Sequence, residues 1–349
     1  MMKMNCFTAL ALSSLVLLSP RVEAQSGRIR TPVSERATHD DKDTVRLRAE
    51  EVLLPISVRS DTGKLPTFLD RFDFIVSEDG KRQQVTSVMR TPANILLIID
   101  TSGEVLTRKN INLNRELALK IIDSLGDEDQ AAIVTYSDKV TLISGWTKDR
   151  AALRAALNEN FKPGLEGRFY ESLKFAAEEV LPKVSGRRSV VLLTDGVDSD
   201  GARSFSEALA GLNRARATVY VAGHNKMLLD ELRPIVFNKL SWFEMIDPQV
   251  RKRYNFMRRY AKQLEAAEVV LADLAQETGG AIWNPEKRED FPSLTPKIVE
   301  EIGTEYVVAY SSERDPRDRE FHSVKVFVTR RDLKVRSRRG VYANPGAGN

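Results

Sequence analysis

The chain has 349 residues, of which 42% are hydrophobic and 29% are charged, and this ordinary globular composition disfavours disordered, collagen-like and polytopic membrane proteins. Its 53 basic and 49 acidic residues leave a net charge of +4, too balanced for a dedicated nucleic-acid-binding protein. With three histidines and one cysteine, a His/Cys zinc cluster, a disulfide framework and a cysteine nucleophile are also disfavoured. At roughly 150 residues per domain, the length predicts more than one domain.

Residues 1–24 have the pattern of a secretory signal peptide. Lys3 precedes an apolar run from Cys6 to Leu18, and the segment ends at Ala24 with small residues at the cleavage positions. The run is shorter than the roughly 20 residues that span a bilayer, and no later stretch is apolar enough to do so. We therefore expect an exported protein, periplasmic or secreted, without a transmembrane segment in the mature chain. The polar residues 25–44 should form a flexible tether.

Two regions near the ends of the chain predict strands without helices. Residues 45–92 contain short β-type runs separated by turns at Asp61-Thr-Gly63 and Glu78-Asp-Gly80. Residues 304–343 return to this pattern, and residues 344–349 form a tail. The expected strands are Val45–Arg48, Val52–Val58, Phe72–Val76, Glu305–Ser311, His322–Thr329 and Leu333–Ser337.

Between residues 93 and 303, apolar runs alternate with helical segments, which is typical of an open, mainly parallel sheet covered by helices. We expect strands at Ile95–Asp100, Ala131–Tyr136, Val140–Ser144, Ser189–Thr194, Thr218–Ala222 and Ala281–Trp283. We expect helices at Asn112–Leu125, Asp149–Asn158, Tyr170–Leu181, Ser204–Ala215 and Val269–Thr278. The predicted class is α/β, with a Rossmann-like, doubly wound sheet inserted between two halves of a small β module. The two ends could instead form separate units.

The segment 225–267 is longer than an ordinary strand-to-helix connection, so it should contain helices of its own. Basic residues outnumber acidic ones in it, and aromatic side chains are interleaved. One interpretation is a solvated helical face whose aromatic residues pack on the domain. The other is a surface for an anionic glycan, a lipid surface or a protein, with these candidate contacts: Arg251, Lys252, Arg253, Arg258 and Arg259.

Two of the predicted strands end in aspartate. Asp100 closes an apolar strand and is followed by Thr101 and Ser102, while Asp195 follows another apolar strand directly. In an open parallel sheet the carboxyl ends of the strands form the ligand crevice. Carboxylate and hydroxyl oxygens there suit Mg²⁺, Mn²⁺ or Ca²⁺. For each aspartate alone, a helix cap or a turn is the simpler interpretation.

This pattern resembles the metal-ion-dependent adhesion site of von Willebrand factor A (VWA) domains, whose motif is DxSxS with a distant Thr and a distant Asp. The α/β part resembles the domain from about residue 94 to 303, and both flanks are similar to a bacterial group of secreted VWFA-related proteins. The resemblance implies that Asp100, Ser102 and Asp195 are metal ligands. It also places Gly167, Arg168, Glu171 and Asp198 around the site.

Two positions depart from the family motif, because Glu104 stands where the second Ser belongs, and Gly167 with Arg168 replaces the Thr loop. In one outcome Glu104 coordinates the ion itself. In another, Arg168 neutralises the carboxylates and no metal is needed, since guanidinium pairs well with carboxylate. In a third, a weak site remains with Asp100, Ser102, Asp195 and water ligands.

The resemblance implies an exported, non-enzymatic adhesion module that binds a protein, matrix or envelope partner. A structural scaffold in a cell-envelope assembly is the alternative. A metal-assisted hydrolase is a third hypothesis, because an Asp after the first strand also opens phosphatases of the haloacid-dehalogenase type. Those enzymes need a second Asp two positions later as general acid, where this chain has Ser102. The G-x-S-x-G, H-E-x-x-H and P-loop motifs are missing too, so we expect binding and not turnover.

Overall fold

A computed structural model describes residues 50–62, 66, 68–103, 108–199, 204–238, 246–315, 318 and 320–342. The predicted signal peptide, tether and tail, and the candidate ligand Glu104, lie outside these residues. No helix in the described part of the chain combines the length and the apolar character needed to cross a membrane.

The central sheet has six strands in the order β6-β5-β4-β7-β8-β9. Five run parallel, and β6 pairs antiparallel with β5 at one edge. All seven residues of β4 are buried, as expected for a strand that is covered on both faces. The strands are β4 (Asn94–Asp100), β5 (Gln130–Tyr136), β6 (Val140–Thr147), β7 (Arg188–Thr194), β8 (Ala217–Gly223) and β9 (Ile282–Trp283).

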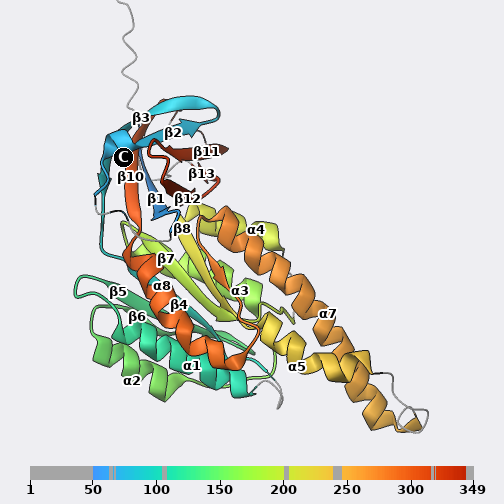
Figure 1. The fold of residues 1–349 in the computed structure, drawn as a ribbon. Coiled ribbons are helices and arrows are strands. Elements are labelled where there is room, and N and C mark those ends of the chain that lie inside the picture. Colours follow the sequence, from blue (N-terminus) through green and yellow to red (C-terminus); the bar gives the residue numbers. More distant parts are fainter. Residues whose placement is uncertain are drawn as a thin grey trace, which may run out of the picture. The chain divides into compact units, whose positions relative to one another are not determined.

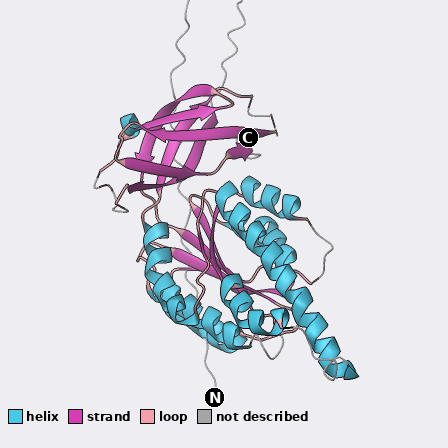
Figure 2. Ribbon diagram, turned by 45° about the vertical axis from the view of Figure 1, so that its right-hand side comes forward, coloured by secondary structure: helices cyan, strands magenta, loops and turns pink. Residues whose placement is uncertain are grey.

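Helices cover both faces of this sheet, as Figures 1 and 2 show. Leu96 and Ile98 of β4 pack with residues of α3, α4 and α7 on one face. Leu97 and Ile99 point the other way and pack with α1, α2 and α8. The doubly wound α/β prediction is therefore confirmed. The helices are α1 (Arg108–Asp123), α2 (Arg150–Asn160), α3 (Phe169–Phe175), α4 (Phe205–Arg214), α5 (Asn225–Phe237), α7 (Pro248–Glu277) and α8 (Leu294–Gly303).

The segment 225–267 contains α5 and most of α7, a continuous helix of 30 residues. The expected short helix at Val269–Thr278 is only the end of α7. Asp247 caps its N-terminus by accepting from the backbone N–H of Gln249 and Val250. From Met257 onward, buried residues recur along one stripe with helical spacing: Met257, Ala261, Leu264, Ala267, Leu271, Leu274 and Ala275. The first of them pack with α5, and the last three pack against the central sheet.

The flanking strands form one antiparallel sheet of seven strands in the order β12-β1-β10-β3-β2-β11-β13. Strand β1 pairs with β10 and β12, and β2 pairs with β11, so both ends of the chain contribute to the same sheet. The α/β region is thus inserted between β3 and β10, and the alternative of two separate β units is wrong. The strands are β1 (Glu50–Ser60), β2 (Phe74–Glu78), β3 (Lys81–Met89), β10 (Tyr306–Ser312), β11 (Phe321–Val328), β12 (Leu333–Ser337) and β13 (Gly340–Tyr342).

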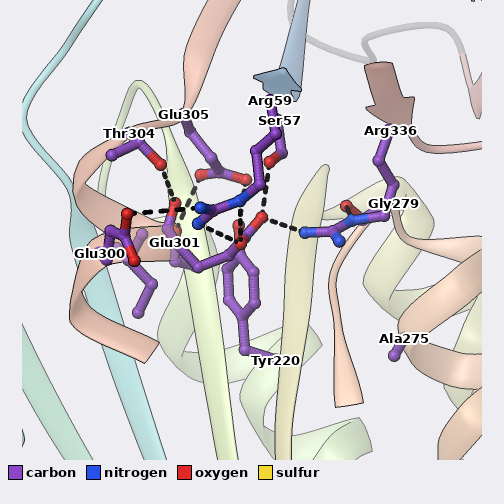
Figure 3. Close-up of polar contacts among 12 residues, drawn as sticks. Ser57, Arg59, Tyr220, Ala275, Gly279, Glu300, Glu301, Thr304, Glu305 and Arg336 are labelled. Atoms are coloured by element: carbon purple, nitrogen blue, oxygen red, sulfur yellow. Dashed lines mark hydrogen bonds and ion pairs between the residues drawn. The ribbon is translucent and has the colours of Figure 1, made fainter. Parts of the chain in front are cut away.

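Glu301, near the end of α8, links the two sheets (Figure 3). Its carboxylate accepts hydrogen bonds from Ser57 and Arg59 of β1 and from Arg336 of β12. Burial alone would raise the pKa of Glu301, but Arg336, Ser57 and Arg59 outweigh it and hold that pKa below its usual value. The insertion is therefore attached to the antiparallel sheet by charge-assisted hydrogen bonds as well as by the chain connections.

Candidate binding site

Asp100 lies at the carboxyl end of β4, where only 3% of its surface is exposed. Its Oδ1 accepts hydrogen bonds from the backbone N–H and the hydroxyl of Ser102, at 2.8 and 2.6 Å. Its Oδ2 lies 3.0 Å from the hydroxyl of Tyr136 and 3.1 Å from that of Thr194. These two hydroxyls end the neighbouring strands β5 and β7 and also contact each other. Protein groups therefore surround both carboxylate oxygens.

The hydrogen count in this cluster favours a protonated Asp100. Tyr136, Thr194 and Asp100 make three mutual contacts, but the two hydroxyls carry only two hydrogens. A proton on the carboxyl group supplies the third. Burial, together with the nearby charge of Asp195, raises the pKa of Asp100 to about 7, which agrees with that count.

Asp195 follows β7 and is held from two sides. Its Oδ1 accepts the backbone N–H of Val197 at 2.9 Å, and its Oδ2 accepts the hydroxyl of Tyr260 at 2.6 Å. The amide of Asn225 donates to the carbonyl oxygens of Asp195 and Leu264, and so ties the strand end to α7. Burial and the charge of Asp195 raise the pKa of Tyr260 well above its usual value, so this phenol stays a donor.

The loop before α3 closes the edge of the site. Gly164 exchanges backbone hydrogen bonds with Thr101 and Gly103. Gly167 donates its N–H to the Ser199 hydroxyl, and its carbonyl oxygen accepts the backbone N–H of Ser199. A Cβ atom at Gly167 would lie 3.3 Å from the hydroxyl of Ser102 and 2.8 Å from a backbone carbonyl oxygen. The structure thus places Gly167 directly beside Ser102, in a space that excludes a side chain unless the loop shifts.

The charged residues predicted around the site make local contacts. Arg168 donates to Glu171 at 3.2 Å and lies 3.8 Å from Glu166. Asp198 accepts the backbone N–H of Tyr170 in the first turn of α3. These contacts stabilise the start of α3 and hold the Arg168 guanidinium near the loop acids. Hydroxyl and backbone groups donate hydrogen bonds to Asp100 and Asp195, and the hypothesis that Arg168 neutralises these carboxylates stays a prediction.

A cavity of about 230 Å³ opens beside this edge. Ser102, Gly167 and Asp195 line one side, and side chains of α5 and α7 form an apolar wall on the other. Leu165, Ile235 and Phe256 are exposed at its lining, which gives the opening an apolar rim. The α5 and α7 residues that line the cavity are Leu228, Glu231, Leu232, Ile235, Phe256, Met257, Tyr260 and Gln263.

Comparison with known proteins agrees with this geometry, because residues 94–252 match the family model of the von Willebrand factor type A domain. The chain contains a VWA domain. No curated protein gives a match. The matched region includes Asp100 and Asp195, whereas Tyr260 and the other α7 residues that line the cavity lie just beyond it.

Several solved structures are similar at low identity. Proximal thread matrix protein 1 from the mussel byssus is 14% identical, with a TM-score of 0.44, over 75% of this chain and 50% of that chain. A von Willebrand factor type A protein from Catenulispora acidiphila is 12% identical, with a TM-score of 0.43, over 80% and 76%. An aerotolerance-related membrane protein from Bacteroides fragilis is 15% identical, with a TM-score of 0.40, over 60% and 98%. The chain thus spans half the length of the mussel protein, another structure of which has a zinc-occupied MIDAS motif.

Among the described residues, the oxygen ligands at this edge of the sheet do not complete a site for a divalent ion. Asp100, Ser102 and Asp195 offer oxygen atoms, but both carboxylate oxygens of Asp100 already contact hydroxyl groups, and the hydroxyl of Tyr260 binds Oδ2 of Asp195. Gly167 has no hydroxyl to add. Among the residues that the structure describes, no group of three or more His, Cys, Asp and Glu side chains is arranged to hold a metal ion. The role of Glu104 stays a prediction.

Sequence reasoning missed three hydroxyl groups of this site. Tyr136 and Thr194 end apolar strands, so the rule that led to Asp100 and Asp195 could have found them. Tyr260 had no such signal, since it lies 65 positions after Asp195 and was grouped with the other aromatic residues of the insertion. The five candidate surface residues on α7, Arg251, Lys252, Arg253, Arg258 and Arg259, are all exposed.

Proposed function

We propose that this chain is an exported, non-catalytic module that binds a protein partner at the carboxyl edge of its VWA sheet. The cavity carries this proposal, because it combines an apolar wall with a few polar groups, as binding sites commonly do. The exposed side chains of Leu165, Ile235 and Phe256 offer anchoring points for an apolar residue of the partner.

We further propose that this site recognises its partner without a divalent ion. Tyr136, Thr194 and Tyr260 bind the carboxylates that a metal would otherwise need.

The exposed basic residues of α7 favour an acidic partner. Arg251, Lys252 and Arg253 are exposed in its first turns, and Phe256 of the cavity follows one turn later. An acidic segment with an apolar side chain would place its charge against these residues and its apolar group in the cavity. Such charges mainly increase the rate of association and the specificity.

Photo-cross-linking in the producing cell tests the proposed binding edge. A photoreactive amino acid replaces Phe256 at the cavity, and in a matched control it replaces Phe327 of β11, which is 52% exposed on the antiparallel sheet. We expect a discrete adduct from position 256 that persists in the presence of a chelator. Adducts from position 327 alone would contradict the proposal and support the envelope-scaffold alternative.

A further inference from the structure

Arg338 is a buried charge without a hydrogen-bond partner. It follows β12, and only 1% of its surface is exposed. Its Nε, Nη1 and Nη2 atoms all lack a partner among the described residues. An isolated ion in a protein interior is costly unless a counter-charge lies beside it, so this arrangement calls for a compensating group.

The carboxylates near Arg338 are bound by other residues. Glu305 is close enough to favour its charged form, but that carboxylate accepts hydrogen bonds from Arg187 and Tyr220. Glu277 makes an ion pair with Arg339, the next residue in the chain. Neither acid is therefore available as a dedicated partner of Arg338.

A second cation lies near the same place. The charge of Arg216, just after α4, acts on Arg338, and so do Glu305 and the Tyr310 phenol. Burial, with Arg216, lowers the pKa of Arg338 to about 10, which still leaves the guanidinium charged at neutral pH. The hydroxyl of Tyr310 is also buried without a hydrogen bond inside the usual distance. The junction thus holds a second charged group beside Arg338, whose donor atoms no described residue uses.

We propose that the Arg338 guanidinium binds a small inorganic anion at the junction between the VWA domain and the antiparallel sheet. A planar guanidinium with three free donor atoms matches a halide or an oxyanion such as phosphate or sulfate. Backbone contacts hold Arg338 at the junction, because the N–H of Arg339 donates to the carbonyl oxygen of Glu277 at the end of α7. This anion would stabilise the attachment of the two sheets, a role separate from partner binding at the cavity.

Buried water is the competing explanation. Water molecules could accept the hydrogen bonds of Arg338, but they would leave its charge uncompensated. The two explanations differ in how stability responds to anions. A specific site makes the melting temperature rise with the anion concentration until the site is filled, whereas buried water gives no such dependence.

Thermal unfolding of the full chain tests the anion site. Chloride, sulfate and phosphate are each titrated at constant ionic strength, with the bulky anion gluconate as the balance. We expect at least one to raise Tm by roughly 5 °C at about 100 times its dissociation constant. Arg338→Met should lose this rise, and Arg330→Met, at an exposed arginine, should keep it. Equal anion responses in the wild type and Arg338→Met would overturn the proposal.

A direct measurement covers the case in which Arg338→Met does not fold. Crystals of the wild-type chain grown in bromide should show an anomalous peak beside the Arg338 guanidinium. Density for water alone at that position, with bromide bound elsewhere or nowhere, would also overturn the proposal.

Discussion

The hydroxyl of Tyr260 donates a 2.6 Å hydrogen bond to Oδ2 of Asp195, across 65 positions of the sequence. This bond joins the middle of α7 to the carboxyl edge of the sheet, at the point where a divalent ion would need a free carboxylate. Together with Tyr136 and Thr194 at Asp100, it means that the chain itself supplies the partners of both aspartates.

Tyr260→Phe removes this hydrogen bond and leaves the ring in place. A partly buried hydrogen bond to a carboxylate contributes about 1–3 kcal/mol, so the free energy of unfolding should fall by that amount. Tyr254→Phe is the matched control, because its hydroxyl makes a longer bond of 3.3 Å to a backbone carbonyl oxygen of α5. Urea unfolding measures both variants, and an equal loss in the two would contradict the special role of Tyr260.

Asp100 should make stability depend on pH. Its pKa in the folded chain is raised to about 7, above the ordinary value of 3.8, so the folded state binds a proton that the unfolded state has released. The contribution of Asp100 to stability is thus greatest at acidic pH and is lost as the pH rises from about 4 to about 7.

Asp100→Asn should remove that part of the pH dependence, since the amide is neutral throughout and its NH2 group can donate to the hydroxyl cluster. The difference in unfolding free energy between Asp100→Asn and the wild type should therefore move in favour of the variant between pH 4 and pH 7. Urea titrations at several pH values measure it. A difference that stays constant with pH would show that Asp100 titrates normally.

Glu301 should contribute far more to the free energy of unfolding than its neighbour Glu300. Glu301→Gln leaves Arg59 and Arg336 without their shared counter-charge at the junction (Figure 3), and we expect a loss of about 2–3 kcal/mol, given their partial exposure. The carboxylate of Glu300 is half-exposed and makes one longer contact to Arg59, so Glu300→Gln should change little. Because the pKa of Glu301 is lowered, the difference between Glu301→Gln and the wild type should shrink as the pH falls below about 4.

Charge reversal at the start of α7 tests the acidic-partner proposal. Arg251→Glu, Lys252→Glu and Arg253→Glu together should leave stability almost unchanged, since acidic residues suit a helix N-terminus. The yield of adduct from position 256 should fall, and more so at low salt than at high salt. Reversal of the exposed Arg82 and Arg331, away from the cavity, should have no effect on that yield. Equal yields in both variants would show that the basic residues at the start of α7 do not contribute to partner binding.

The parallel sheet could be predicted closely from local pattern. Strands β4 and β7 are apolar runs that end in polar residues, and the observed bounds differ from the expected ones by a single residue. Helix α8 was not expected, because Pro296 interrupts a segment that resembles a loop. Helix α7 was cut short, since Met257, Ala261 and Leu264 make a weak apolar stripe among basic and aromatic residues.

The site was predictable only where it follows strand ends. Asp100 and Asp195 obey that rule, and the structure brings them close enough for their charges to interact. The hydroxyl partner of Asp195 comes from a helix far along the chain, and its position depends on the packing of the whole insertion. The three outcomes for the replaced motif positions were inferred from the motif alone, which carries no information on where the long side chain of Arg168 points.

The hydroxyl groups of Tyr136, Thr194 and Tyr260 complete this site in place of a metal. Calorimetric titration of the chelator-treated chain with Mg²⁺, Mn²⁺ and Ca²⁺ tests this claim most directly. We predict no saturable heat up to about 1 mM ion, the range in which weak extracellular Ca²⁺ modules bind. Saturable binding of one ion, abolished by both Asp100→Ala and Asp195→Ala, would show that the site holds a metal and would contradict this claim.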